Sequence, residues 1–198
     1  MRIALVLLAL AAALAVVLGF VATRGGKAVD FRGSEPPEGL MLPDFEVRTA
    51  SGETLRSADL RGRAVAVTFL DTQCTEACPI LAAQMGQAMR ALGKDRSRVV
   101  ALAFSVDPVN DTPARIRSFL ERYRALGLVR YVDGSVAELR PVWKEFKILA
   151  SHDTGQSNMH SAPVRVYDGE GRWRSTLHPS VDLSGPNLAH DLRTALAS

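Results

Sequence analysis

Two cysteines, Cys74 and Cys78, are the residues of this chain whose type and spacing most directly suggest chemistry. On a helical turn, residues four apart lie on the same side, and their Cα atoms are roughly 6 Å apart, a separation that a disulfide accepts. A pair this close closes only one small loop and cannot brace a whole domain. The two thiols therefore act locally, either as a reactive pair or as inert residues of a core.

The sequence around the cysteines predicts a strand, a loop and a helix. Ala64 to Phe69 is a short apolar run typical of a buried strand, and apolar residues follow at helical spacing from Ile80 to Leu92. Pro79 suits the first position of that helix, and backbone N–H groups at a helix start favour a thiolate and lower the thiol pKa. The residues flanking the cysteines are too polar for a core: Asp71, Thr72, Gln73, Thr75 and Glu76.

The rest of the chain alternates between strand and helix patterns. A second apolar run, Arg98 to Val106, completes a β-α-β unit, and the turn sequence Asp168-Gly169-Glu170-Gly171 predicts a β-hairpin. Further helices are expected at 112–123, 135–146 and 187–196, and the hairpin strands at 162–167 and 173–177. This order predicts an α/β fold, a thioredoxin-like sandwich with a mixed central sheet and helices on both sides.

The N-terminal region predicts a membrane anchor. The 20 residues from Ile3 to Ala22 carry no charge, and a helix of about 20 residues spans roughly 30 Å, the thickness of a bilayer core. The run is longer than the apolar region of a cleaved signal peptide, which is the alternative interpretation. We expect residues 1–24 to form one N-terminal transmembrane helix, residues 25–41 a flexible linker and residues 42–198 the folded domain.

Composition and missing motifs exclude several classes of function. The formal net charge of +3, without blocks of like charge, gives no basic surface for nucleic acid. The sequence has no Gly-rich phosphate loop, no nucleophile elbow around a serine and no His-Glu-x-x-His zinc motif. A thioredoxin-type reductase has two residues between its cysteines, whereas this chain has three.

Five motifs, in order along the chain, resemble the Sco/SenC family. The segment FLDTQCTEACP from Phe69 to Pro79 resembles the family's C-x-x-x-C-P motif after an aromatic strand end. The segment SVDPVNDTP from Ser105 to Pro113 is similar to its S-V-D-P-x-[RN]-D-T-P signature. The other agreements are Leu42-Pro43-Asp44-Phe45 with Gly52 and Leu60-Arg61-Gly62, then Asp133-Gly134-Ser135, then Met159-His160-Ser161 with Asp168 and Gly171.

The resemblance implies a copper site made of Cys74, Cys78 and His160, which would hold Cu(I) or Cu(II). Soft thiolates suit Cu(I), imidazole suits either oxidation state, and three ligands leave the metal open to an incoming ligand. The implied function is a copper metallochaperone that delivers copper to the binuclear copper site of a respiratory cytochrome oxidase. The alternative is a thiol-disulfide oxidoreductase that reduces the cysteines of that oxidase site, with Cys74 and Cys78 as the redox pair.

The resemblance also implies a location and partners. The copper-receiving subunit of the oxidase is the expected partner, with other copper chaperones or thiol reductants as further candidates. The charges that flank the apolar run do not decide its orientation. The resemblance implies a single-pass protein of the cytoplasmic membrane whose soluble domain faces the periplasm or another extracytoplasmic side.

Several other residues keep alternative interpretations. His152 and Met159 lie close to His160 in sequence and could add a weak ligand. Asp107 and Asp111 could form a metal or catalytic pair, although turn and helix-capping roles are favoured. Surface positions are expected for His178 and His190, and core positions for Met85 and Met89.

The cysteine loop departs from the family pattern. The family usually has glycine, tyrosine and histidine where this chain has Leu70, Asp71 and Gln73, and a proline-aspartate pair where this chain has Thr75-Glu76. The sulfur ligands are retained, but the loop is more acidic, which could tune copper affinity or reduction potential.

Overall fold

A mixed five-stranded sheet forms the centre of the domain in the computed structural model, which describes residues 30–49, 53–156 and 163–198. The strand order is β5-β4-β3-β6-β7. β3, β4 and β5 run parallel, whereas β6 is antiparallel to β3 and β7 is antiparallel to β6. The strands are β3 (Ala64–Leu70), β4 (Val99–Ser105), β5 (Arg130–Val132), β6 (Val164–Tyr167) and β7 (Trp173–Leu177).

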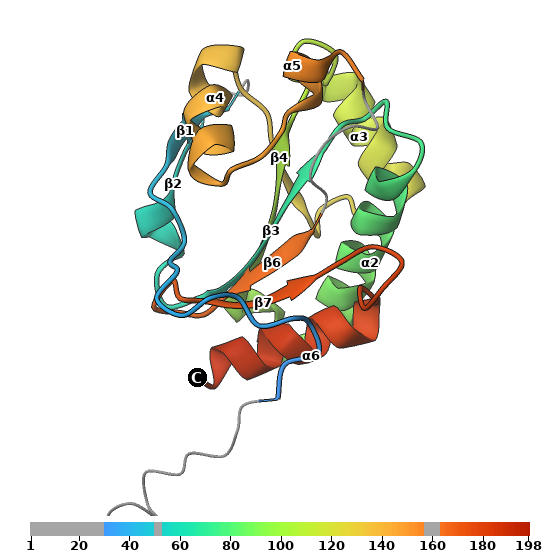
Figure 1. Ribbon diagram of the computed structural model, residues 1–198. Helices are drawn as coiled ribbons and strands as arrows, with labels where there is room; N and C mark the ends of the chain where they lie inside the picture. The colour runs from blue at the N-terminus through green and yellow to red at the C-terminus, as the bar shows by residue number, and fades with distance from the viewer. Residues whose placement is uncertain (1–29, 50–52, 157–162) are drawn as a thin grey trace, which may run out of the picture. The chain divides into compact units, whose positions relative to one another are not determined.

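Helices cover both faces of this sheet, as Figure 1 shows. One core cluster joins the sheet to α2, α3 and α6, and a second joins the opposite face to α4 and to the small β1–β2 hairpin. The helices are α2 (Ala77–Ala91), α3 (Pro113–Arg122), α4 (Val136–Glu145), α5 (Ser151–Thr154) and α6 (Gly185–Leu196). The remaining elements are β1 (Glu46–Arg48), β2 (Thr54–Arg56) and two 3-10 turns, η1 (Ser57–Leu60) and η2 (Gly93–Arg98).

Side chains of β3 alternate between the two faces of the sheet, so the strand contributes to both hydrophobic cores. Successive side chains of a strand point to opposite faces, so Ala64, Ala66 and Leu70 join the α2 side while Val65, Val67 and Phe69 join the α4 side. All seven residues of β3 are buried. A strand buried on both faces reads as a continuous apolar run, which is why it could be predicted from the sequence.

Most of the predicted elements are confirmed. The two apolar runs are β3 and β4, the predicted hairpin is β6 with β7, and Thr112 and Ser135 are the N-caps of α3 and α4. Met85 and Met89 lie in the core, as expected. One detail differs: α2 begins at Ala77, so Pro79 is its third residue and not its first. Proline is tolerated there because the N–H groups of the first helical turn have no intrahelical partner.

The compact unit extends further toward the N terminus than the predicted boundary at Leu42. It begins at Phe31, and Ser34 exchanges backbone hydrogen bonds with Thr176, in both directions at 2.9 Å. The buried Asp191 of α6 accepts from the backbone N–H groups of Arg32 and Gly33, at 2.7 and 3.1 Å. The Gly and Pro content of residues 31–41 therefore reflects an irregular segment that is hydrogen-bonded to the domain.

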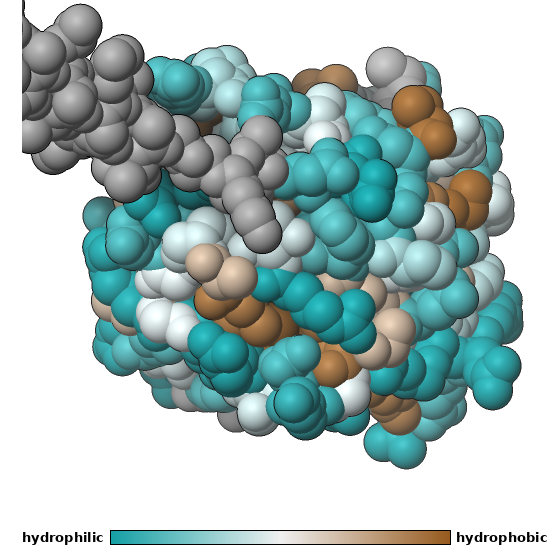
Figure 2. All heavy atoms as spheres, turned by 90° about the horizontal axis from the view of Figure 1, so that it is seen from below, coloured by the Kyte–Doolittle hydropathy of each residue, from teal (hydrophilic) through white to brown (hydrophobic). Residues whose placement is uncertain are grey.

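The predicted membrane anchor, residues 1–24, lies outside the described residues. Within residues 30–49, 53–156 and 163–198, no helix has the length and hydropathy needed to cross a bilayer. Seen from below, the surface of the domain is mostly hydrophilic and is broken by small groups of apolar side chains (Figure 2).

Candidate functional site

The loop between β3 and α2 carries Cys74, and the second residue of α2 is Cys78. This loop lies at the upper end of the sheet in Figure 1, close to α3 and α5. The N–H of Cys74 donates to the carbonyl of Asp71 at 3.2 Å, which folds the loop back on itself. The N–H of Cys78 donates to Cys74 Sγ at 3.5 Å, so the two cysteines are brought together as predicted. Both are thiols in the structure, and their residues are 4% and 0% exposed.

Burial, and not the helix start, controls the acidity of the inner thiol. The pKa of Cys78 is raised far above its ordinary value, first by burial and then by the neighbouring Cys74. The prediction that the helix N-terminus lowers the thiol pKa is therefore wrong for Cys78, because loss of solvent outweighs the helix amides. Binding of a metal to this sulfur must release its proton.

Asp71 anchors the start of the cysteine loop from within the protein. Its Oδ1 accepts from the N–H of Gln73 at 2.7 Å, and its Oδ2 accepts from the hydroxyl of Ser151 at 2.9 Å. Asp71 is fully buried although its type suggested a loop exposed to solvent. The side chain thus ties the loop to α5, an element 80 residues away in the sequence.

Asp111 anchors the middle of the same loop. Its Oδ1 accepts from the N–H and the hydroxyl of Thr72, at 2.9 and 2.6 Å. Its Oδ2 lies 2.6 Å from both the Ser105 and the Tyr131 hydroxyls, and the Tyr131 hydroxyl also lies 3.0 Å from the Leu70 carbonyl. The expected capping role of Asp111 is wrong, because the hydroxyl of Thr112 accepts from the α3 N–H group.

Burial dominates the electrostatics of this network. It raises the pKa of Asp71 and of Asp111, although hydrogen bonds to each carboxylate act in the opposite direction. The pKa of the Tyr131 phenol is raised well above its ordinary value, first by burial and then by the charge of Asp111. A carboxyl surrounded by hydroxyls can be hydrogen-bonded in either protonation state, since a hydroxyl both donates and accepts.

Asp107 has the predicted turn role. Its carbonyl accepts from the N–H groups of Asn110 and Asp111, at 3.1 and 2.9 Å, and its Oδ2 accepts from the Asn110 amide at 2.7 Å. The Gln73 amide donates to the same oxygen at 3.3 Å, so the turn after β4 also contacts the cysteine loop.

Two hollows flank the cysteine loop. The first, of about 420 Å³, is lined by Cys74 and by side chains of α3. The second, of about 350 Å³, is lined by Gln73, Asp107 and His152 among others, but by neither cysteine. The imidazole of His152 lies near the indole of Trp143, with ring centroids 6.1 Å apart and the ring planes tilted by 37°. Among the described hollows, only the one beside α3 gives access to a thiol.

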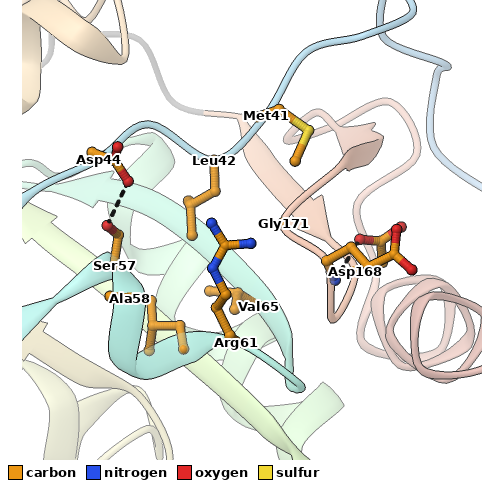
Figure 3. A pocket seen from close by; sticks show the side chains of 11 residues that line it. Met41, Leu42, Asp44, Ser57, Ala58, Arg61, Val65, Asp168 and Gly171 are labelled. Atoms are coloured by element: carbon orange, nitrogen blue, oxygen red, sulfur yellow. Dashed lines mark hydrogen bonds between the residues drawn. The ribbon is translucent and has the colours of Figure 1, made fainter.

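A third hollow, of about 170 Å³, lies at the other end of β3 (Figure 3). Met41 and Leu42 form one wall, and the hydroxyl of Ser57 donates to Asp44 at 3.2 Å. Val65, near the start of β3, lines it, whereas the cysteine loop follows the end of that strand. At about 3.3 Å per residue the two lie roughly 20 Å apart. This hollow is therefore separate from the cysteine site.

The third predicted ligand, His160, and the candidate weak ligand Met159 lie outside the described residues. His178 is exposed as expected, whereas His190 is half-buried and its Nδ1 lies 3.2 Å from Asp191. Within the described ranges, no group of three or more His, Cys, Asp or Glu side chains is arranged to hold a metal. The two cysteines are therefore the described part of the candidate site.

Sequence reasoning missed the anchors of the loop, which are Asp71, Ser151 and Tyr131. Ser151 lies 80 residues from Asp71, and Tyr131 lies 61 residues from Leu70, the last residue of β3. Local sequence patterns do not predict contacts between residues so far apart. The one available signal was a charged residue, Asp71, directly after a predicted buried strand, since a charge in that position must find partners if it is buried.

The fold and the cysteine position define a thioredoxin-like α/β protein with a thiol pair at a strand-to-helix turn. The thioredoxin domain of a thiol-disulfide oxidoreductase from Bacteroides vulgatus superposes with a TM-score of 0.59 at 14% identity, covering 81% of this chain and 99% of that one. The family model SCO1/SenC matches residues 34–197. This chain belongs to the SCO1/SenC family, and the thioredoxin-like fold predicted from the sequence is confirmed.

Individual relatives agree with this assignment. A SCO2-like protein from Rickettsia felis is 24% identical over 138 residues, which cover 66% of this chain and 65% of that protein. The structure of Bradyrhizobium japonicum ScoI with copper bound superposes with a TM-score of 0.64 at 25% identity, covering 78% of this chain and 98% of that one.

Proposed function

We propose that this protein is a copper metallochaperone that binds Cu(I) or Cu(II) through Cys74, Cys78 and His160. Its recipient is the binuclear copper site of a respiratory cytochrome oxidase. The proposal includes the location: residues 1–24 anchor the chain in the cytoplasmic membrane, and the domain faces the periplasm or another extracytoplasmic side. Membership of the SCO1/SenC family and the copper-bound relative support this function.

The observation that carries the proposal is the juxtaposition of the two thiols at the end of β3. The Cys78 N–H is bonded to Cys74 Sγ, and Cys74 lines a hollow while Cys78 is fully buried. Two thiolates form a soft donor set, which favours Cu(I) over harder cations. The donor set therefore fits copper, and Cys74 borders a hollow in which an incoming ligand could compete for the metal.

The same pair supports a second candidate function, a thiol-disulfide oxidoreductase that reduces the cysteines of the oxidase site. The bond between the Cys78 N–H and Cys74 Sγ holds the Cys74 sulfur against the second residue of α2, where a disulfide with Cys78 can form. In this function Cys74 attacks the partner's disulfide from the open hollow, and Cys78 then displaces the partner.

Titration of the reduced full-length chain in detergent separates the two functions. Cu(I), presented with a chromogenic chelator as competitor, is expected to bind in a 1:1 ratio, and the Cys74→Ser and Cys78→Ser variants are expected to lose at least tenfold in affinity. The His160→Ala variant is expected to lose at least tenfold in affinity for Cu(II), because thiolates alone are a poorer donor set for that ion. His178→Ala is the matched control, because this exposed histidine follows β7, and its affinity should equal that of the wild type.

Three results would contradict parts of this proposal. An absence of stoichiometric copper binding would exclude the chaperone function and leave the oxidoreductase. Unchanged affinities for both ions in His160→Ala would remove histidine from the site. Normal oxidase maturation in cells that carry only the Cys74→Ser or the Cys78→Ser protein would contradict both functions.

A further inference from the structure

We propose that the hollow between the cysteine loop and α3 is a docking groove for an acidic, cysteine-bearing segment of a partner polypeptide. The inference rests on the proposed function, because it names the kind of partner that exchanges copper or disulfides with Cys74. Its walls are formed by two elements. The loop contributes Thr72, Gln73, Cys74 and Thr75, and the helical side contributes Arg115, Ser118, Phe119, Arg122 and Tyr123.

The first step of the argument concerns access. Cys78 is fully buried, and Cys74 is almost so, at 4% exposed. Of the described hollows, only this one is lined by a cysteine, and the hollow on the other side of Gln73 contains neither. The groove therefore offers a ligand a place to bind beside Cys74.

The second step concerns charge. The charged residues that line the groove are Arg115 and Arg122, and both are cationic and exposed. One Arg115 nitrogen donates to the Asn110 carbonyl at 3.1 Å, which leaves other donors of the guanidinium for a partner. Arg122 forms no ion pair with any residue that the structure describes. The acidic residue of this helix, Glu121, is paired with Arg117 at 3.0 Å, outside the groove.

The third step concerns shape. Arg115 and Arg122 are seven residues apart on α3, two helical turns, so their Cα atoms lie about 10 Å apart along one helix face. Ser118, Phe119 and Tyr123 line the groove as well, so it combines two guanidinium groups with two aromatic side chains. An extended peptide covers about 10 Å in three residues. A segment with carboxylates on both sides of its cysteine therefore matches the groove, and it brings the cysteine to Cys74.

The arginines would act on the partner in two ways. They attract an acidic segment and raise its encounter rate, an effect that salt screens. They also stabilise the thiolate form of a cysteine that enters the groove, because a nearby cation favours the charged form. A thiolate is the form that attacks a metal ion or a disulfide, so recognition and reactivity are supplied by the same two side chains.

Exchange with two synthetic peptides tests this inference on the reduced full-length chain. Each peptide carries one cysteine as a 2-pyridyl disulfide, flanked on both sides by Asp and Glu in one peptide and by Asn and Gln in the other. The Cys74 thiol releases its proton, its sulfur forms a bond to the peptide sulfur, and the pyridyl sulfur leaves as pyridine-2-thione, which takes up a proton. We expect the acidic peptide to react about tenfold faster at low salt and both to react equally in high salt.

Variants locate the preference. Arg115→Ala with Arg122→Ala should abolish it, and Arg115→Glu with Arg122→Glu should reverse it in favour of a lysine-flanked peptide. Arg117→Ala is the matched control, because Arg117 lies on the same helix outside the groove, and it should retain the preference. Equal rates for the two peptides in the wild type, or a preference retained by the double alanine variant with an unchanged melting temperature, would overturn the inference. A preference for oxidised glutathione over both peptides would overturn its polypeptide part.

The copper titration keeps this inference separate from the proposed function. The double alanine variant should bind Cu(I) within about twofold of the wild type, because neither arginine is a ligand. If the wild type binds no copper but distinguishes the peptides, the chaperone function fails while the groove is supported. If the wild type binds copper but does not distinguish the two peptides, the docking-groove proposal fails while the chaperone function stands.

Discussion

The carboxyl group of Asp111, beneath the cysteine loop, is surrounded by hydrogen-bond donors. Four donors from three residues lie within 2.9 Å of its two oxygens: the Thr72 N–H and the hydroxyls of Thr72, Ser105 and Tyr131. Because these groups come from the loop, from β4 and from β5, a single side chain fixes the loop relative to two strands. Replacing it would alter the site without touching a sulfur.

Asp111→Asn should change the pH dependence of stability in a defined direction. Burial raises the pKa of Asp111 above its ordinary value in the folded state. The protonated form is therefore favoured by folding, and its contribution is fully present below the unfolded pKa and is lost as the pH rises through the folded pKa. Urea unfolding of both proteins should show that the wild type loses stability relative to Asp111→Asn as the pH rises. Each tenfold difference in proton affinity between the folded and unfolded states corresponds to about 1.4 kcal/mol.

Glu138→Gln is the control of opposite sign. Hydrogen bonds from Ser135 lower the pKa of Glu138, so its contribution is present above the unfolded pKa and is lost as the pH falls through the folded pKa. The free energy of unfolding of the wild type should therefore increase relative to that of Glu138→Gln as the pH rises. A stability difference between the wild type and Asp111→Asn that stays constant or grows with pH would contradict the assignment of Asp111.

Among the elements, α4 shows how a local signal supports the distant site. Its N-cap is a capping box: the Ser135 hydroxyl accepts from the Glu138 N–H at 3.2 Å, and Glu138 accepts from the Ser135 N–H at 2.9 Å. The same helix carries Trp143, whose indole N–H donates to the Ser105 carbonyl at 2.9 Å. The capping box therefore stabilises α4, the helix whose Trp143 contacts the end of β4. Ser105, at that end, is also one of the residues bonded to Asp111.

Ser135→Ala should lower the free energy of unfolding by about 1 kcal/mol, because the Glu138 N–H loses its partner at the helix start. Chemical denaturation with the fluorescence of the two tryptophans as the signal measures this change. Ser118→Ala, on the exposed face of α3, is the control and should change stability by less than about 0.5 kcal/mol. An equal loss in both variants would show that the capping box contributes nothing specific.

The success of prediction from the sequence differed between these elements for physical reasons. β3, β4 and the longer helices have enough residues for their apolar period to be read, and Thr112 and Ser135 carry cap signals. β1, β2 and α5 have three or four residues each, too few to show a period. The loop anchors could not be predicted, because contacts such as Asp71 with Ser151 depend on how the sheet brings distant segments together.

At the scale of the whole molecule, both ends of the folded unit are joined. Asp191 of α6 accepts from the N–H groups of Arg32 and Gly33, and Ser34 pairs with Thr176 of β7. Gly33 is required there by space: an ideal Cβ would lie 2.4 Å from Ser175 Oγ and 2.5 Å from the Thr176 carbonyl oxygen. A protein cut at Leu42 would lose these contacts, so a shortened domain that keeps them must begin at or before Phe31.

Gly33→Ala should release this N-terminal segment and lower stability by about 1–3 kcal/mol, because the added methyl group has no room. Limited trypsin digestion at the bond after Arg32 measures the release and should be at least tenfold faster in the variant. Gly169→Ala is the control, since its Cβ would meet the nearest atom at 3.4 Å, an ordinary contact. Equal cleavage rates in Gly33→Ala and the wild type would show that the segment is not held by this packing.

The hydrogen bonds that hold the cysteine loop have one more consequence. The carboxyl groups of Asp71 and Asp111 hold the loop through backbone N–H groups and hydroxyls of Thr72, Gln73 and Ser151. What the sulfurs bind can therefore change while the loop backbone keeps its supports. A protein that must take up and release a cargo repeatedly gains speed from this separation, because little reorganisation of the chain accompanies each exchange.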